Sequence, residues 1–312
     1  MADGSRFVHI VDDVPELSGE RPVLVLVLHG FLDAGNAAGI ASDHLEELGG
    51  GRGGGKVVAT FDVDEFYDYR ARRPAISFVR DHYEQYDAPR MTVRLMRDRQ
   101  MLPYLFLRGP EPDSRWEGFA AAVREVVERF DVSSVLSLAA VPMAVPHTRP
   151  IAITPHATDP DLIDGESRWQ GELRIPSSAQ ALLELRLGEW GHHALGFVAH
   201  VPHYISQMGY PRAAIALLEK TEAASGLSLD SGGLASAAEQ TDDEIAGYLA
   251  TNDDVNQVVA GLEQQYDSFQ LGEESGMSLL ADDAPLPTGE EIGAQFERFL
   301  AGLDSPDSTD DV

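Results

Sequence analysis

The sequence predicts an α/β protein, a three-layer α/β/α sandwich built on a mostly parallel sheet. The unbroken apolar run VLVLVL at 23–28 is typical of a strand that is buried on both faces, as the strands of parallel sheets are. From this run to about residue 220, strand-like and helix-like segments alternate, and such alternation favours a layered α/β arrangement over separate all-α and all-β parts.

The elements of this core follow from local signals. Glycine-rich residues 30–39 form a turn after the first strand, and the apolar spacing that follows predicts a helix packed on the sheet. One apolar stripe predicts a helix over 115–130, Ser177 or Ser178 is placed to cap another, and Pro211 to begin a third. Further strands are predicted at 56–61, 132–138, 150–154 and 193–199.

The segment 91–107 interrupts the alternation with two apolar runs around a short polar turn, which predicts a β-hairpin. Pro103 disfavours a central position in a sheet, so we expect an edge strand or an excursion that mediates self-association, with a simple extension of the sheet as the alternative. The predicted organisation is therefore an N-terminal segment (1–22), a core (23–220) with a hairpin insertion at about 90–108, a helical C-terminal domain that is a possible lid (221–302), and a disordered acidic tail (303–312).

Composition excludes several classes of partner. The 52 acidic and 23 basic residues give a net charge of -29, which repels nucleic acids and anionic membranes. The chain has no Cys, so disulfides, thiolate nucleophiles and cysteine-bound metals are excluded. With neither a long apolar span nor a secretory signal, we expect a cytoplasmic protein. The basic residues are nearly all Arg, with Lys only at Lys56 and Lys220, and this bias fits either a GC-rich genome or a salt-adapted surface.

Motifs for the common cofactors and catalytic devices are missing. Gly30 and Gly35 are followed by Asn36 and Ala37 where a Walker loop needs Lys and Ser or Thr, and the glycine spacing does not match a dinucleotide fingerprint. No GxSxG nucleophile elbow occurs in the chain. We therefore expect no cofactor, no assigned catalytic residue and, because Pro202 separates the histidines near residue 200, no metal site.

A polar cluster is nevertheless predicted where ligands gather in open parallel sheets, at the carboxyl ends of the strands. The turns after residues 28 and 61 and the loop at 200–204 contribute the candidate ligand-binding residues Asp33, Asn36, Asp62, Asp64 and His203. The carboxylates of this cluster favour the binding of a cationic or hydroxyl-rich group over that of a phosphate. In the alternative interpretation, these residues cap loops or face water.

The segments GFLDAG (30–35), FDVDEF (61–66), GFVAHVPHY (196–204) and PRAAIALL (211–218) together resemble the proteasome assembly chaperone 2 family, in its actinobacterial branch. The resemblance implies a core similar to nucleoside phosphorylases and peptidyl-tRNA hydrolases, a helical C-terminal addition and a homotrimer. Two functions stay open: a non-enzymatic oligomer that binds an unknown partner protein in assembly or regulation, or an enzyme that acts on nucleosides or small acyl substrates under a helical lid.

Overall fold

A computed structural model of the chain describes residues 4–12, 17, 19, 21–50, 55–163 and 172–274. The chain to Glu263 forms one compact unit, and the chain from Gln264 forms a second. The predicted tail (303–312), residues 275–302 of the predicted lid and most of the glycine-rich loop at 49–55 lie outside the described residues.

One eight-stranded sheet forms the middle layer of the first unit. Its four neighbouring strands β7, β2, β8 and β10 are parallel, and antiparallel pairs flank them on both sides. In spatial order the strands are β1 (Val8–Ile10), β3 (Lys56–Phe61), β6 (Thr92–Arg97), β7 (Pro103–Pro110), β2 (Leu24–His29), β8 (Val135–Met143), β10 (Ala194–Pro202) and β9 (Ile153–Ala157).

Helices cover both faces of the sheet, which confirms the predicted three-layer α/β/α class. On β2, Leu24, Leu26 and Leu28 belong to one buried core, while the alternating Val25 and Val27 belong to the other. The first core lies under α2 (Trp116–Arg129) and α3 (Ala179–Glu189), and the second lies under α1 (Ala37–Leu48) and α4 (Pro211–Ser225).

The helical region that follows begins with α5 (Ala235–Leu249), which packs against α4, and continues with α6 (Asp253–Glu274). Short 3₁₀ turns occur at Gly4–Arg6, Ala34–Asn36, Val63–Glu65, Pro160–Leu162, His203–Ile205 and Ser231–Leu234.

Two of the sequence signals that predict where a helix begins are confirmed. Ser178 caps α3, since its Oγ accepts a hydrogen bond from the backbone N–H of Ala181 at 3.1 Å. Pro211 is the first residue of α4. By contrast, the capping-box pattern TDDE at 241–244 predicts a helix start that is wrong. α5 already begins at Ala235, and Thr241 is a buried residue within it.

The position expected for the 91–107 hairpin is also wrong. The hairpin exists, as the antiparallel pair β6–β7, but it lies inside the sheet between β3 and β2. Pro103 is tolerated because it is the first residue of β7 and pairs only with Arg97 of β6, whereas pairing with β2 begins at Leu105. This hairpin is packed within its own chain and is not available for self-association.

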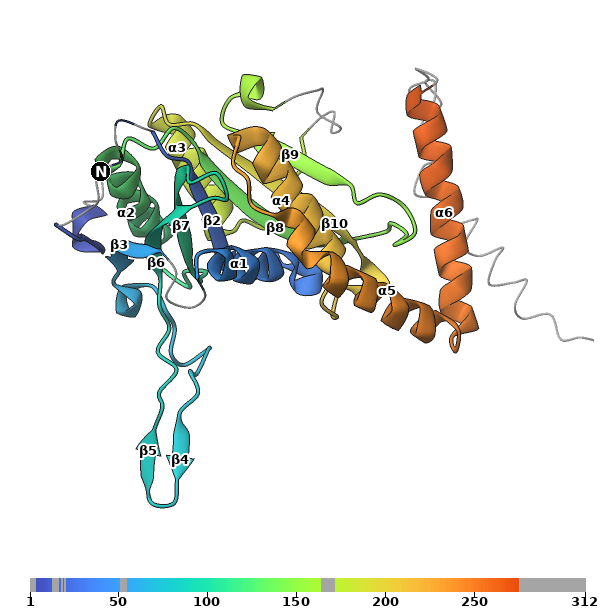
Figure 1. Cartoon of the computed structure of the whole chain (residues 1–312), viewed down its shortest axis with the longest axis horizontal. Coiled ribbons are helices and arrows are strands. Elements are labelled where there is room, and N and C mark those ends of the chain that lie inside the picture. Colours follow the sequence, from blue (N-terminus) through green and yellow to red (C-terminus); the bar gives the residue numbers. More distant parts are fainter. Residues whose placement is uncertain are drawn as a thin grey trace, which may run out of the picture. The chain divides into compact units, whose positions relative to one another are not determined.

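The excursion that the chain does make lies elsewhere. The strands β4 (Ser77–Val79) and β5 (His82–Glu84) pair only with each other, and Figure 1 shows them standing apart from the large sheet. We call residues 75–87 the arm; its base is closed by a hydrogen bond from the backbone N–H of Asp87 to the carbonyl of Ala75.

Candidate functional site

The loop between β2 and α1 is shaped by a carboxylate at the start of the helix. Asp33 accepts hydrogen bonds from the backbone N–H groups of Ala38 (2.7 Å) and Gly39 (2.9 Å), which have no partner within the helix. Gly35 and Asn36 reach this arrangement with positive φ angles of 65° and 48°. Burial raises the pKa of Asp33, and the two hydrogen bonds oppose that rise.

A second carboxylate accepts a hydrogen bond from the backbone at the start of α3. Glu111, just after β7, accepts hydrogen bonds from the backbone N–H of Ala179 (2.9 Å) at the start of α3 and from that of Phe31 (3.2 Å) in the β2 loop. Gly30 is required here, because a Cβ at this position would lie 2.1 Å from a Glu111 carboxylate oxygen. Both helix N-termini, the usual places for a bound phosphate, are therefore occupied by the protein's own carboxylates.

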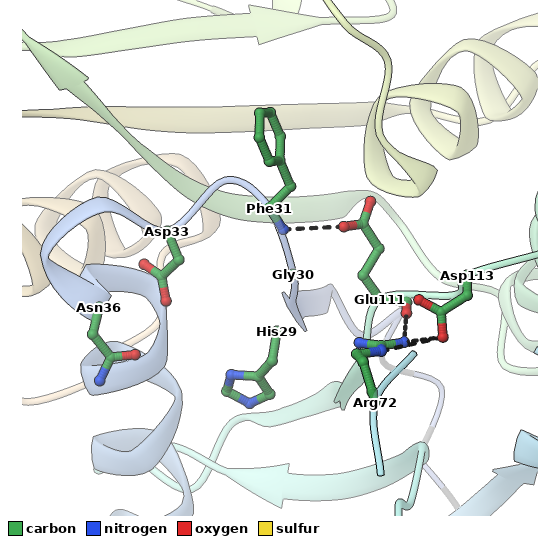
Figure 2. Close-up of a pocket in the computed structure, with 8 residues that line it drawn as sticks. All are labelled: His29, Gly30, Phe31, Asp33, Asn36, Arg72, Glu111 and Asp113. Atoms are coloured by element: carbon green, nitrogen blue, oxygen red, sulfur yellow. Dashed lines mark hydrogen bonds and ion pairs between the residues drawn. The ribbon is translucent and has the colours of Figure 1, made fainter. Parts of the chain in front are cut away.

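Between these carboxylates lies a hollow of about 590 Å³, which we call the cleft. It is lined by His29, Gly30, Phe31, Asp33, Asn36, Arg72, Glu111 and Asp113 (Figure 2). Arg72 closes one side, since its guanidinium donates to Asp113 Oδ2 at 2.5 Å and to the Glu111 carbonyl at 2.7 Å. Phe31 at the rim is 73% exposed, so the cleft offers a flat apolar ring beside polar groups.

The predicted cluster is divided by the structure. Asp33 and Asn36 line the cleft, but Asp62 and Asp64 line a neighbouring groove of about 930 Å³ that runs over β3, β6 and β7. His203 lines neither; it is exposed, and its Nδ1 lies 3.4 Å from the Met143 carbonyl. Its loop nevertheless meets the Asp33 turn through backbone hydrogen bonds between Gly35 and residues Ser206 and Tyr210.

His29 lines both hollows and is held by Arg108 of β7. The Arg108 Nε donates to His29 Nε2 at 3.0 Å, and its other nitrogens reach Glu46 (2.5 Å) and Asp43 (2.6 Å) on α1. Burial lowers the pKa of His29, and the positive charge of Arg108 lowers it further. The imidazole is therefore neutral at neutral pH. A neutral histidine beside a cleft can accept or donate one proton.

Sequence reasoning missed Arg72, Glu111 and Asp113. Arg72 lies in the Tyr- and Arg-rich run at 66–73, and its hydrogen bonds to Asp113 and to the Glu111 carbonyl hold it at the cleft. Glu111 and Asp113 follow β7, whose central position was not predicted. A polar segment after a buried apolar strand, GPEPDS at 109–114, was the available signal.

The helices after residue 220 do not line the cleft within the described part of the chain. They form ion pairs with residues that do not line the cleft. Asp242 of α5 pairs with Arg212 of α4, and Glu263 of α6 pairs with Arg149. Arg149 lies near His147, whose Nδ1 is 2.7 Å from the hydroxyl of Tyr204. The lid expected over Asp33 and Asp62 is therefore not found among residues 221–263.

Neither metal-ligating clusters nor membrane-spanning helices occur among the described residues. They contain no group of three or more His, Asp or Glu side chains arranged to hold a metal ion. No helix among them is long and apolar enough to cross a membrane.

Comparison with known proteins supports the resemblance seen in the motifs. The model of the PAC2 family matches residues 27–248. The Mycobacterium tuberculosis protein Rv2714, of unknown function, is 41% identical with a TM-score of 0.80, over 86% of this chain and 91% of that one. A protein of unknown function from Corynebacterium glutamicum is 34% identical with a TM-score of 0.78, over 84% and 97%.

A third structure carries a functional description of its own. The proteasome-assembly chaperone homologue Rv2125 of Mycobacterium tuberculosis is 28% identical, with a TM-score of 0.67, over 76% of this chain and 99% of that one. Among curated proteins, none matches the chain.

Proposed function

The chain belongs to the PAC2 family, and from this premise we propose that it is a non-enzymatic homo-oligomer, a trimer, that binds a partner protein in an assembly or regulatory role in the cytoplasm. The observation that carries the proposal is the arm. Its Phe78 and Tyr83 are 62% and 69% exposed, and their rings contact each other at 5.1 Å between centroids. Large aromatic side chains in this state are typical of protein interfaces.

The charge of the arm and its base supports a protein partner. Residues 66–90 carry five Arg and four acidic residues, in a chain whose net charge is -29. Enrichment in Arg and aromatic residues is the compositional signature of the centre of an interface. An isolated two-stranded hairpin is also marginal in water, so contact with a second surface would stabilise the arm.

The oligomer is tested by light scattering on the double variant Phe78→Ser, Tyr83→Ser. We expect the wild-type chain to have three times the mass of the 33.9 kDa protomer, and the variant to have the protomer mass. Tyr248→Ser is the matched control, because Tyr248 is an aromatic residue of α5 with 47% exposure. A monomeric wild-type protein would contradict the oligomer, and an unchanged mass in the double variant would exclude the arm as its interface.

The partner is tested with proteasome subunits, because Rv2125 is described as a proteasome-assembly chaperone homologue. Purified α-subunits of the same organism are mixed with the chain, and complexes are followed by native electrophoresis. A stable complex that is lost in the double variant of the arm supports the proposal. Absence of any complex at micromolar concentrations would exclude these subunits as the partner.

The cleft supports a second candidate, an enzyme that acts on nucleosides or small acyl substrates. Its polar groups and the exposed ring of Phe31 suit a hydroxyl-rich ligand with a flat base. Because Asp33 and Glu111 already occupy the two helix N-termini, hydrolysis of a nucleoside is favoured over phosphorolysis. A thermal shift with nucleosides, alone and with inorganic phosphate, tests this: specific binding raises the melting temperature, and Phe31→Ser should abolish the rise.

A further inference from the structure

His29 offers the cleft a single ring N–H group, because Arg108 binds its other ring nitrogen. The Arg108 Nε donates to His29 Nε2 at 3.0 Å. A guanidinium can only donate hydrogen bonds, so Nε2 is the acceptor nitrogen and the proton of the neutral imidazole is on Nδ1. Burial, and next the charge of Arg108, lower the pKa of His29 and so keep the ring in this neutral form. His29 is therefore a hydrogen-bond donor at Nδ1.

Arg108 is itself held in place by two carboxylates of α1. Its Nη1 lies 2.5 Å from Glu46 and its Nη2 lies 2.6 Å from Asp43, and its side chain is 24% exposed. Because both terminal nitrogens are bound, the guanidinium cannot turn its Nε away from His29 without breaking these ion pairs. The position of the proton on His29 is thus set by residues that do not line the cleft.

The Nδ1–H group of His29 is available to a ligand. Within the described part of the chain, Nδ1 has no hydrogen-bond partner. Figure 2 shows the imidazole inside the cleft, and the ring nitrogen nearer to the main chain, which is Nδ1, is on the side of Asp33 and Asn36. A ligand in the cleft therefore meets an N–H donor whose position is fixed from behind.

The carboxylates that line the cleft are already engaged. Asp33, Glu111 and Asp113 each accept hydrogen bonds from at least two N–H groups of the protein. Arg72 adds further donors: its Nε and Nη2 bind Asp113, whereas its Nη1 binds no residue that the structure describes. The groups left to bind a ligand are thus mainly N–H donors, which require acceptor atoms on the ligand.

We propose that the cleft selects nucleosides whose base carries a carbonyl oxygen where related bases carry an amino group, that is, uridine over cytidine and inosine over adenosine. His29 donates from Nδ1 to this carbonyl oxygen, and the base lies against the exposed ring of Phe31. Arg108 is a positioning residue, because it acts on the ligand only through the proton of His29.

The selection follows from the direction of one hydrogen bond. An amino group in place of the carbonyl would direct its own N–H at the N–H of His29, and both donors would be left without a partner. A site that is built to bind one polar group discriminates strongly against an analogue that leaves this site group unpaired. The selectivity of the cleft therefore depends on which nitrogen of His29 carries the proton.

This inference rests on the second proposed function, the cleft as a nucleoside site, and the two can fail separately. Calorimetric titration compares uridine with cytidine, and inosine with adenosine, on the full chain. We expect the carbonyl-bearing member of each pair to bind about tenfold more tightly or better. Equal or reversed affinities would overturn this inference alone, whereas no binding of any of the four would overturn the nucleoside function and this inference with it.

Nitrogen-15 NMR of labelled histidine rings reads the position of the proton without any ligand. The chain has ten histidines, and the signals that disappear in His29→Gln belong to His29. At about pH 8, where the ring is neutral, we expect a protonated Nδ1 and an unprotonated Nε2 in the wild type. In Arg108→Met the proton should be shared between both nitrogens. A wild-type His29 with its proton on Nε2 would overturn the proposal.

Both variants should reduce the affinity ratios toward one: His29→Gln because an amide can turn either its carbonyl or its NH₂ group to the ligand, and Arg108→Met through the tautomer. Arg186→Met is the matched control, since Arg186 is 27% exposed and also binds two carboxylates, Glu117 and Glu189. It should change neither the ratios nor the tautomer. Melting curves check folding, and wild-type ratios in folded His29→Gln would overturn the proposal even if Arg108→Met does not fold.

Discussion

The two β-hairpins of this protein have opposite environments. β6–β7 lies inside the large sheet, where Phe106 is completely buried, whereas β4–β5 pairs with no other strand and leaves Phe78 62% exposed. Both hairpins contain aromatic and aliphatic residues. The difference teaches that an apolar hairpin is only a candidate for self-association, and that strand pairing decides whether it becomes core or interface.

The largest expected effect is the contrast between these two phenylalanines. Phe106→Ala should lower the free energy of unfolding by about 3–5 kcal/mol, because it leaves a cavity in the core. Phe78→Ala should change the free energy of unfolding of the dissociated protomer by less than about 0.5 kcal/mol. Urea unfolding of both variants in dilute solution measures the difference, and similar losses would mean that the arm packs on its own chain.

A smaller effect separates two carboxylates of the predicted cluster. Asp33→Ala should cost about 1–2 kcal/mol, since it removes the acceptor for two N–H groups at the start of α1. Asp62→Ala should change stability by less than about 0.5 kcal/mol, because Asp62 is exposed and makes no capping hydrogen bond. Thermal unfolding checks both, and equal losses would contradict the assigned capping role.

The smallest expected effect is the pH dependence of stability, which has opposite signs for His29, held by Arg108 of β7, and for His82 on the arm. Burial and Arg108 of β7 lower the pKa of His29, so the unfolded chain binds this proton more readily and stability falls as pH decreases below about 6.5. Hydrogen bonds to Asp81 and Glu84 raise the pKa of His82 on β5, so its contribution is present at low pH and is lost as pH rises through the raised pKa.

The measurement compares unfolding free energies at about pH 8 and about pH 5 for the wild type, His29→Gln and His82→Gln. His29→Gln should reduce the loss of stability on acidification. His82→Gln should increase that loss slightly, because its histidine is exposed on the arm. If His29→Gln left the loss of stability on acidification unchanged, His29 would be protonated as easily in the folded chain as in the unfolded one, which would contradict its lowered pKa.

The amino-acid sequence by itself determined the features that depend on neighbouring residues. The apolar run of β2 predicted a strand buried on both faces, and Leu24 and Val25 are both completely buried. Ser178 and Pro211 predicted the starts of their helices, because capping and a fixed φ act within one turn of the chain. The order of four short motifs indicated the family, which the family model over residues 27–248 confirms.

Only the tertiary structure decided which segments meet. Pro103 disfavours the centre of a sheet, yet β7 lies there because its pairing with β2 begins beyond the proline. Asp33 and Asp62 follow neighbouring strands in the chain, but β7 and β6 lie between β2 and β3 and divide the predicted cluster. His156 of β9 and Glu184 of α3 meet only through the packing of that helix on the sheet. No local pattern records such a contact, because long-range contacts depend on the whole arrangement of the sheet and its helices.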